Sequence, residues 1–280
     1  MKYGIITSAG SVHDYITMAT EAEACGWDGV FVWDDICVGP GDTFDPWIAL
    51  GAMSAVTEQV TLGSMVFSLA RRRPWKVARE TVTLDHLANG RLVLPVGFGG
   101  AWDGGYSRVN TDAPDRRTRR EKLDECLDIL DRAWSGEPFS YTGKHYQLTD
   151  LVFQPRPVQR PRIPVWTVGA WPHERSLARS ARWDGVIAVD MSPGSSPDDP
   201  LRPEVVTSIH DWVASRRRSM DGFDIVVEGT TDGHRPPADA RQVEPYRAAG
   251  ATWWIESHWD SSVTADFLVE RIRRGPPSGA

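Results

Sequence analysis

Short runs of apolar and β-branched residues alternate along the chain with segments of helical pattern. Eight of these runs have the length and composition of buried strands: 3–7, 29–33, 60–67, 91–98, 163–168, 184–189, 223–228 and 252–256. A strand-then-helix repeat is typical of a parallel sheet, and eight repeats favour closure into a barrel. We therefore expect an α/β fold, a single (β/α)8 TIM barrel.

Proline and glycine mark the limits of the expected helices. Proline costs no hydrogen bond in a first helical turn, which predicts helix starts at Asp45-Pro46, Arg73-Pro74, Ala113-Pro114 and Trp171-Pro172. Helix ends are indicated at Gly26, Asn89-Gly90 and Gly250. Residues 136–164 break the repeat with a turn and four prolines, and they predict a small hairpin followed by an extended connector.

The length of the chain suits one barrel. Its 280 residues are close to the roughly 250 typical of this architecture, so we assign the barrel to residues 1–270 and a frayed tail to 271–280. The loop 191–202 is rich in Ser, Pro, Asp and Gly and follows the sixth expected strand. We expect this loop, together with the hairpin near 141–146, to cover the substrate.

Composition excludes several classes of protein. The 31 basic and 38 acidic residues give a net charge of −7, which provides no overall field for nucleic-acid phosphates. The three cysteines, Cys25, Cys37 and Cys126, form no C-x-x-C pair, as is typical of a reducing cytosol. No apolar stretch is long enough to span a membrane, and no signal segment is recognisable. We expect a cytoplasmic protein.

Candidate chemistry is expected where the strands end, because loops at the C-terminal face of a parallel barrel build its active site. The segment Gly97-Phe-Gly-Gly-Ala-Trp102 is not a dinucleotide fingerprint, since Trp replaces the last glycine; it allows close approach of a flat or phosphorylated ligand, or simply a sharp turn. Residues 168–172 end a strand and open a helix whose free N–H groups suit an anion. The run 71–73 offers guanidinium groups for a phosphate, or else a solvated loop.

Other chemistries find little support. The seven histidines show neither H-x-H nor H-x-x-x-H, so no metal site is expected. No serine lies in G-x-S-x-G. Glu228 and Glu256 end neighbouring strands as glycosidase carboxylates do, and spacing alone leaves that alternative open. A glycosidase, however, explains neither the arginine run nor the glycine clusters.

Several segments resemble one family. Residues 60–100, VTLGSMVFSLARRRPWKVARETVTLDHLANGRLVLPVGFGG, are similar to the third and fourth βα units of bacterial luciferase-like flavin-dependent monooxygenases. Further matches are GWDGVFVWD at 26–34, IPVWTVGA at 163–170 and ARWDGV at 181–186. The resemblance implies a (β/α)8 barrel that binds reduced flavin mononucleotide (FMN) or the deazaflavin coenzyme F-420 at its C-terminal face.

The resemblance also implies roles for individual residues. Ser64 and Met65 would lie behind the isoalloxazine ring, where the family often has a non-proline cis peptide bond. The remaining expected cofactor contacts are the ring edge (Gly97, Gly99), the phosphate or ribityl chain (Val168, Gly169, Ala170), the pocket walls (Trp33, Trp102), and Arg73 and Thr167. Many relatives have a histidine at or near position 35, so the acid or base is left open among Asp35, His173, Glu228 and Glu256.

The first expectation for function is a monooxygenase that uses reduced FMN, dioxygen and a small organic substrate, with a flavin reductase as a further partner. With F-420 the same cleft would transfer hydride instead. A third alternative is a flavin-binding protein without activity. Relatives often dimerise through helices beside strands two and three, and the small residues of segment 49–56 suit a homodimer.

Overall fold

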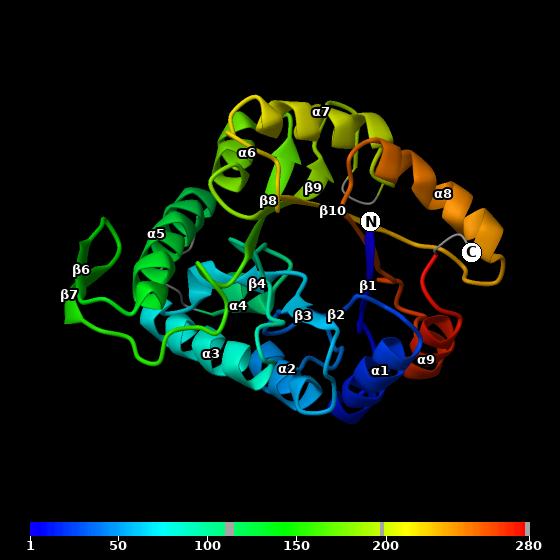
Figure 1. Cartoon of the computed structure of the whole chain (residues 1–280), viewed down its shortest axis with the longest axis horizontal. Coiled ribbons are helices and arrows are strands. Elements are labelled where there is room, and N and C mark those ends of the chain that lie inside the picture. The colour runs from blue at the N-terminus through cyan, green and yellow to red at the C-terminus, as the bar shows by residue number, and fades with distance from the viewer. Residues whose placement is uncertain (110–114, 197–198, 278–280) are drawn as a thin grey trace.

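The structure is a computed structural model that describes residues 1–109, 115–196 and 199–277. In these ranges, nine parallel strands form one sheet in the order β3-β2-β1-β11-β10-β9-β8-β5-β4. They are β1 (Lys2–Ile6), β2 (Gly29–Val32), β3 (Thr61–Ser64), β4 (Phe67–Ser68), β5 (Leu94–Gly97), β8 (Val165–Trp171), β9 (Gly185–Asp190), β10 (Asp224–Gly229) and β11 (Trp253–Glu256). Figure 1 shows the helices arranged around these strands.

The sheet closes into a barrel at the third expected strand. This strand is present as two pieces, β3 and β4, on either side of the Met65–Val66 peptide bond, which is cis. β3 pairs with β2, β4 pairs with β5, and a parallel bridge joins Leu62 to Leu92. All eight expected strands are present, and the predicted (β/α)8 barrel is confirmed.

Helices alternate with the strands as expected. They are α1 (Val12–Ala24), α2 (Pro46–Ser54), α3 (Pro74–Leu87), α4 (Gly104–Ser107), α5 (Arg116–Ser135), α6 (Glu174–Ser180), α7 (Pro203–Ala214), α8 (Pro236–Ala248) and α9 (Ala265–Arg273), with a 3-10 turn η1 (Leu69–Arg71) before α3. The starts predicted at Pro46 and Pro74 are confirmed. Asp45 caps α2 because its carboxylate accepts the backbone N–H groups of Trp47 and Ile48.

Of the other two predicted helix starts, one is shifted in the structure and one lies outside the described residues. The helix expected at Trp171-Pro172 begins at Glu174 instead, because β8 continues through Trp171 and pairs with β9 as far as Asp190. The start predicted at Ala113-Pro114 lies outside the described residues, and α5 begins at Arg116. The helix ends indicated by glycine are confirmed, since Gly26, Gly90 and Gly250 have positive φ directly after α1, α3 and α8.

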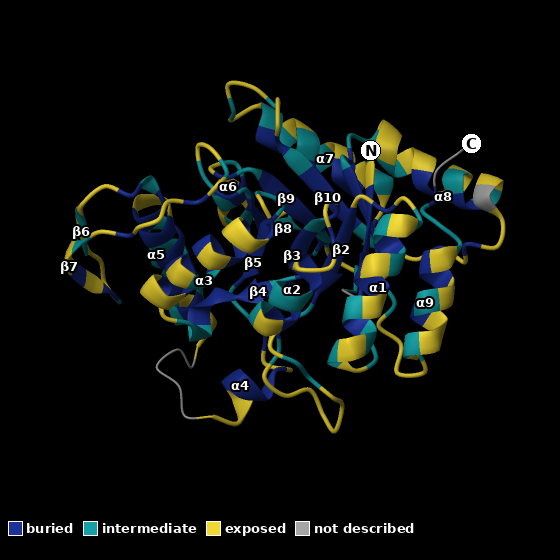
Figure 2. Ribbon diagram, turned by 60° about the horizontal axis from the view of Figure 1, so that its bottom comes forward, coloured by how far each residue is buried: buried dark blue, intermediate teal, exposed yellow. Residues whose placement is uncertain are grey.

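Apolar side chains pack in two layers, one inside the barrel and one between the sheet and the helices. In Figure 2 the strands of the barrel are coloured mostly as buried, whereas the helices carry both buried and exposed residues. The inner layer consists of Ile6, Phe31, Met65, Val93, Trp166, Ile187, Val226, Trp253 and Ile255. Because side chains alternate along a strand, every second residue continues this inner layer toward the C-terminal end of the barrel. Trp33, Val168 and Glu228 stand in these rows, at the end where an active site is expected.

The predicted hairpin is present but lies away from the strand ends. It consists of β6 (Phe139–Thr142) and β7 (Gln147–Leu151), and Figure 1 shows it projecting beside α5. Tyr146 and Leu148 pack on Ile129 of α5, and the Glu125 carboxylate accepts N–H groups from the hairpin turn. These contacts anchor it to the outside of α5, so the expectation that it covers the substrate is not supported.

The C-terminal segment is packed further than expected. α9 continues to Arg273, and the side chain of Arg271 is fully buried. Its guanidinium donates to the Thr231 hydroxyl and to the Gly275 carbonyl. The boundary expected at residue 271 therefore falls inside a packed helix, and the last three residues, 278–280, are outside the described part of the chain.

Candidate active site

A cavity of about 1590 Å³ lies at the C-terminal ends of the strands. Its walls come from the loops after β1, β2, β5, β8, β9 and β11 and from the first turns of α5 and α6. Pockets for single ligands usually measure about 300–1,000 Å³. The cavity is therefore large enough for a cofactor together with a small substrate.

Most of the expected site residues meet at this cavity. The ones that line it are Trp33, Asp35, Met65, Gly97, Gly99, Trp102, Val168, Ala170 and His173. They come from four separate strand ends, those of β2, β3, β5 and β8, and only the closed barrel brings them together. Met191 also lines the cavity, as expected for the start of the loop 191–202. The roles of these residues toward a cofactor remain predictions.

Thr167 and Gly169 are on the other side of β8. The Thr167 hydroxyl lies 2.7 Å from the Ser180 hydroxyl of α6. A Cβ atom at Gly169 would lie 2.2 Å from the Val186 side chain of β9. Since odd-numbered residues of β8 face α6, these two residues serve packing between strand and helix rather than the cavity wall.

Ser64 and Arg73 do not line the cavity either. Ser64 is fully buried at the end of β3. Arg73 is exposed at the N-cap of α3. The other two arginines of this run turn back toward β2: Arg71 and Arg72 lie 2.5 and 2.7 Å from the Asp34 carboxylate. Two of the three arginines are therefore paired with a carboxylate of the protein itself, Asp34.

Glu256 is the last residue of β11, and its fully buried side chain has several partners. Its carboxylate accepts hydrogen bonds from Thr231 (3.0 Å) and Trp254 (3.1 Å), and it lies 3.3 Å from Arg271 and 3.1 Å from His258. Burial raises its pKa, but the His258 hydrogen bond and the Arg271 charge outweigh this effect and hold the pKa below its ordinary value. Glu256 thus anchors the loop after β10 to α9 and is not on the cavity wall.

Glu228 stands in an inner row of β10, behind a cavity residue. Its carboxylate accepts the indole N–H of Trp259 at 3.4 Å, and Trp259 lines the cavity. Burial raises the pKa of Glu228. The Trp259 ring therefore lies between the Glu228 carboxyl group and the cavity.

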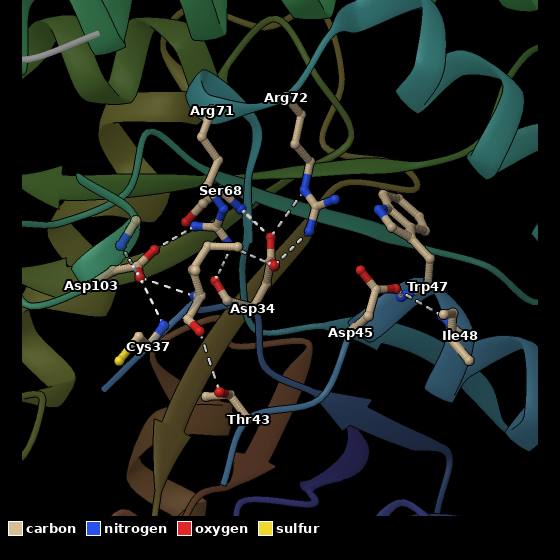
Figure 3. Close-up of polar contacts among 12 residues, drawn as sticks. Asp34, Cys37, Thr43, Asp45, Trp47, Ile48, Ser68, Arg71, Arg72 and Asp103 are labelled. Atoms are coloured by element: carbon tan, nitrogen blue, oxygen red, sulfur yellow. Dashed lines mark hydrogen bonds and ion pairs between the residues drawn. The ribbon is translucent and has the colours of Figure 1, made fainter. Parts of the chain in front are cut away.

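Two buried aspartates hold the loops at the cavity mouth (Figure 3). The Asp34 carboxylate accepts the Ser68 backbone N–H at 2.9 Å in addition to its two arginines. The Asp103 carboxylate lies 2.7 Å from Arg71 and accepts the backbone N–H groups of Ile36 and Gly105. Arg71 thus bridges the two carboxylates and links the loops after β2, β4 and β5.

Asp35 lies within this network and also lines the cavity. Its pKa is raised to about 6 because it is half-buried and lies near the Asp103 and Asp34 carboxylates, while Arg71 and a hydrogen bond from Trp102 act in the opposite direction. Near neutral pH such a group can both give and accept a proton. Among the four expected acid or base residues, Asp35 and His173 line the cavity directly.

Five arginines of the cavity wall were not expected from the sequence. They are Arg116, Arg119 and Arg120 of α5 and Arg175 and Arg179 of α6. Arg179 also pairs with Asp124. A signal for this wall exists in the sequence, since arginines in the first turn of α5 oppose the helix dipole, and such a start is costly unless an anion lies nearby.

Two features are absent from the part of the chain that the structure describes. In these ranges no group of three or more His, Cys, Asp or Glu side chains is arranged to hold a metal ion. No helix in them is both long and apolar enough to cross a membrane.

Several known proteins are similar to this chain in sequence. An uncharacterised protein of Mycobacterium tuberculosis is 36% identical over 189 residues, which is 66% of this chain and 61% of that protein. An F420-dependent glucose-6-phosphate dehydrogenase of Nakamurella multipartita is 27% identical over 285 residues, covering 91% of this chain and 81% of the enzyme.

Solved structures share the barrel. An F420-dependent secondary alcohol dehydrogenase in complex with an F420-acetone adduct matches with a TM-score of 0.78 and 15% identity, over 99% of this chain and 98% of that one. A monooxygenase of Streptomyces bottropensis matches with a TM-score of 0.76 and 17% identity, over 98% and 97% of the two chains. The model of the luciferase-like monooxygenase family matches residues 2–261. The chain therefore belongs to the luciferase-like monooxygenase family of oxidoreductases.

Proposed function

We propose that this protein is an oxidoreductase that binds the deazaflavin coenzyme F-420 and transfers hydride between it and a small organic substrate. The observation that carries the proposal is the wall of five arginines beside the cavity. FMN ends in one phosphate group, whereas F-420 carries a phosphodiester followed by glutamate carboxylates. A long row of cations suits the longer anionic tail better.

The opposite end of the expected cofactor site suits a flat ring. Met65, Val66, Gly97 and Val168 line the cavity where β3, β5 and β8 end. A Cβ atom at Gly97 would lie 2.9 Å from the Val66 side chain. Glycine at this position therefore leaves room for a ring against the ends of these strands, which form the floor of the cavity. The residues present therefore fit a tricyclic ring on the floor, with its tail toward α5 and α6.

Asp35 is the residue that we assign to proton exchange with the substrate. When bound, the deazaflavin would supply the carbon that accepts or gives hydride. Oxidation of an alcohol or amine removes hydride from the carbon and a proton from the O–H or N–H group, and Asp35, with a pKa of about 6, can accept that proton near neutral pH. Arg71 holds the loop that carries Asp35 through its bonds to Asp34 and Asp103.

A monooxygenase that uses reduced FMN and dioxygen is the second candidate. It is favoured by the tryptophans Trp33, Trp102 and Trp259 on the cavity wall, since oxygen chemistry on a flavin needs protection from water. Trp102 is 71% exposed and Trp259 is 53% exposed in this structure. This open arrangement supports hydride transfer as the first candidate.

Equilibrium binding of F-420 and FMN tests the proposal, with arginine variants as the internal comparison. Arg120→Ala removes a cavity arginine, while Arg117→Ala removes a neighbouring arginine that pairs with Glu121 at the surface. We expect Arg120→Ala to weaken F-420 binding about tenfold and Arg117→Ala to leave it unchanged. An identical affinity for F-420 in wild type and Arg120→Ala would contradict the proposal that the arginine wall binds the tail of the cofactor.

We also propose that the protein is a homodimer that pairs through α2. The outer face of this helix exposes Ile48 (73%), and Val56 just after it is 45% exposed, with the small residues Gly51 and Ala52 between them. Sedimentation at micromolar concentration tests this, and a monomer there would contradict it.

A further inference from the structure

The cavity wall opposite the arginines has a different character. It is built by the loops after β1, β2 and β11, which adjoin because β1 pairs with both β2 and β11. α5 and α6 follow β5 and β8, on the far side of the barrel. The residues that line this wall contain no Lys or Arg within the described ranges, and the acidic ones other than Asp34 are Asp35, Asp42 and Asp260.

Two tryptophans form a corner in this wall. The rings of Trp33 and Trp259 are perpendicular, with their centroids 6.5 Å apart, and both line the cavity. The indole N–H of Trp33 is donated to the Tyr15 hydroxyl at 3.2 Å, and that of Trp259 to Glu228 at 3.4 Å. Because both donors are used within the protein, the corner offers a ligand the π faces of the rings.

The charges around this corner favour a cation. The face of an indole ring carries partial negative charge and attracts ammonium groups. Asp35 and Asp260 line the same wall, and the Glu228 carboxyl group behind it accepts the indole N–H of Trp259. A phosphate group here would meet carboxylates without a compensating Lys or Arg on this wall.

We infer that the substrate end of the cavity takes a small organic cation of the alkylammonium type, held between Trp33 and Trp259. The inference rests on the proposed function, which leaves the arginine wall to the anionic tail of the cofactor. The two walls then attract opposite charges, so cofactor and substrate each enter in one orientation. The substrate class therefore differs from that of the relatives named as glucose-6-phosphate dehydrogenases.

The test is calorimetric titration of the cofactor-free protein with three probes. Choline carries a trimethylammonium group, 3,3-dimethyl-1-butanol is its uncharged carbon isostere, and glucose 6-phosphate is anionic. We expect choline to bind about tenfold more tightly than the isostere, and glucose 6-phosphate to bind more weakly than choline. Equal binding of choline and its isostere, stronger binding of glucose 6-phosphate, or no binding of choline at millimolar concentration would overturn the inference.

Two variants locate the site. Trp259→Leu should abolish the preference for choline over the isostere, while Trp75→Leu, which changes an exposed tryptophan of α3 outside the cavity lining, should keep it. Thermal melting of both variants verifies folding, and wild-type protein alone already decides between charge and shape. Retention of the full preference in folded Trp259→Leu would contradict the assignment.

Failure of the substrate inference can be told apart from failure of the proposed function, because F-420 is titrated separately. Binding of F-420 without a preference for choline would defeat the substrate inference alone. A preference for choline without binding of F-420 would defeat the proposed function alone.

Discussion

Asp35 shows how a single side chain acquires a useful proton affinity from its surroundings. It follows a buried strand, and its neighbours are the adjacent Asp34 carboxylate together with the Asp103 carboxylate and the Arg71 guanidinium from two other loops. The sequence identifies Asp35 as a candidate because it stands at a strand end. Its preference over Glu256 could not be predicted, because both follow strands and only the structure shows that Glu256 is turned toward Arg271.

The raised pKa of Asp35 predicts a pH-dependent effect of Asp35→Asn on stability. Burial favours the protonated form, so the wild type is at full stability below pH 3.8 and loses stability as the pH rises to about 6. We expect Asp35→Asn to be more stable than wild type at pH 8, by about 1 kcal/mol because solvent screens the half-buried carboxyl group, and to lack this advantage at pH 3.5. Urea unfolding at both pH values measures the difference; a constant difference would contradict the assignment.

Arg71 is expected to set the pKa of Asp35. Its guanidinium lowers this pKa, so Arg71→Met should move the titration of Asp35 to higher pH. Arg72→Met is the matched control, since Arg72 also pairs with Asp34 but has no contact with Asp103. NMR titration of the Asp35 carboxyl carbon measures both. The same titration curve in Arg71→Met and in wild type would contradict the role of Arg71.

Glu256→Gln should affect stability and leave the arginine wall of the cavity unchanged, since among the described residues the only cavity-lining contact of Glu256 is His258, in the loop after β11. The substitution leaves the buried guanidinium of Arg271 without its carboxylate, which is expected to cost about 3 kcal/mol of unfolding free energy at pH 7. The lowered pKa means that this contribution is present above the unfolded pKa of Glu256 and is lost as the pH falls. Urea unfolding tests the cost, and F-420 affinity should be unaltered. A weakened affinity in folded protein would return Glu256 to the site.

At the scale of elements, β8 and the start of α5 show where sequence patterns succeed and where they are insufficient. The apolar run of β8 correctly predicts a strand, but the pattern does not reveal that it extends through Trp171. The strand therefore places Ala170 on the cavity wall and Gly169 against β9. In α5, the arginines were visible in the sequence, but their position at the cavity depends on the curvature of the closed sheet.

Gly169→Ala tests the packing role of this glycine. A Cβ atom here would lie 2.2 Å from Val186, so we expect a loss of about 1–3 kcal/mol in unfolding free energy. Gly51→Ala, in helix α2 with no atom of the same chain within 4 Å of the added Cβ, should instead stabilise the monomer by up to about 1 kcal/mol. Chemical unfolding of both variants gives the comparison. Equal stability of Gly169→Ala and wild type would show that β8 and β9 can separate without cost.

At the scale of the whole molecule, the fold was predictable and the division of the cavity was not. Eight apolar runs separated by helical segments predict parallel strands that are covered on both faces, and the repeat of eight favours a closed (β/α)8 barrel. The opposite character of the two cavity walls comes from loops far apart in the sequence, such as those that carry Trp33 and Trp259. Only the order of strands around the barrel brings them together.

The central claim is that this cavity is built for a deazaflavin. Equilibrium dialysis of the protein against equal concentrations of F-420 and FMN, followed by analysis of the bound fraction, tests it most directly. We expect F-420 to occupy most of the sites at low salt. Rising salt should weaken its binding, since the arginine wall acts through charge. Preferential occupancy by FMN would contradict the account.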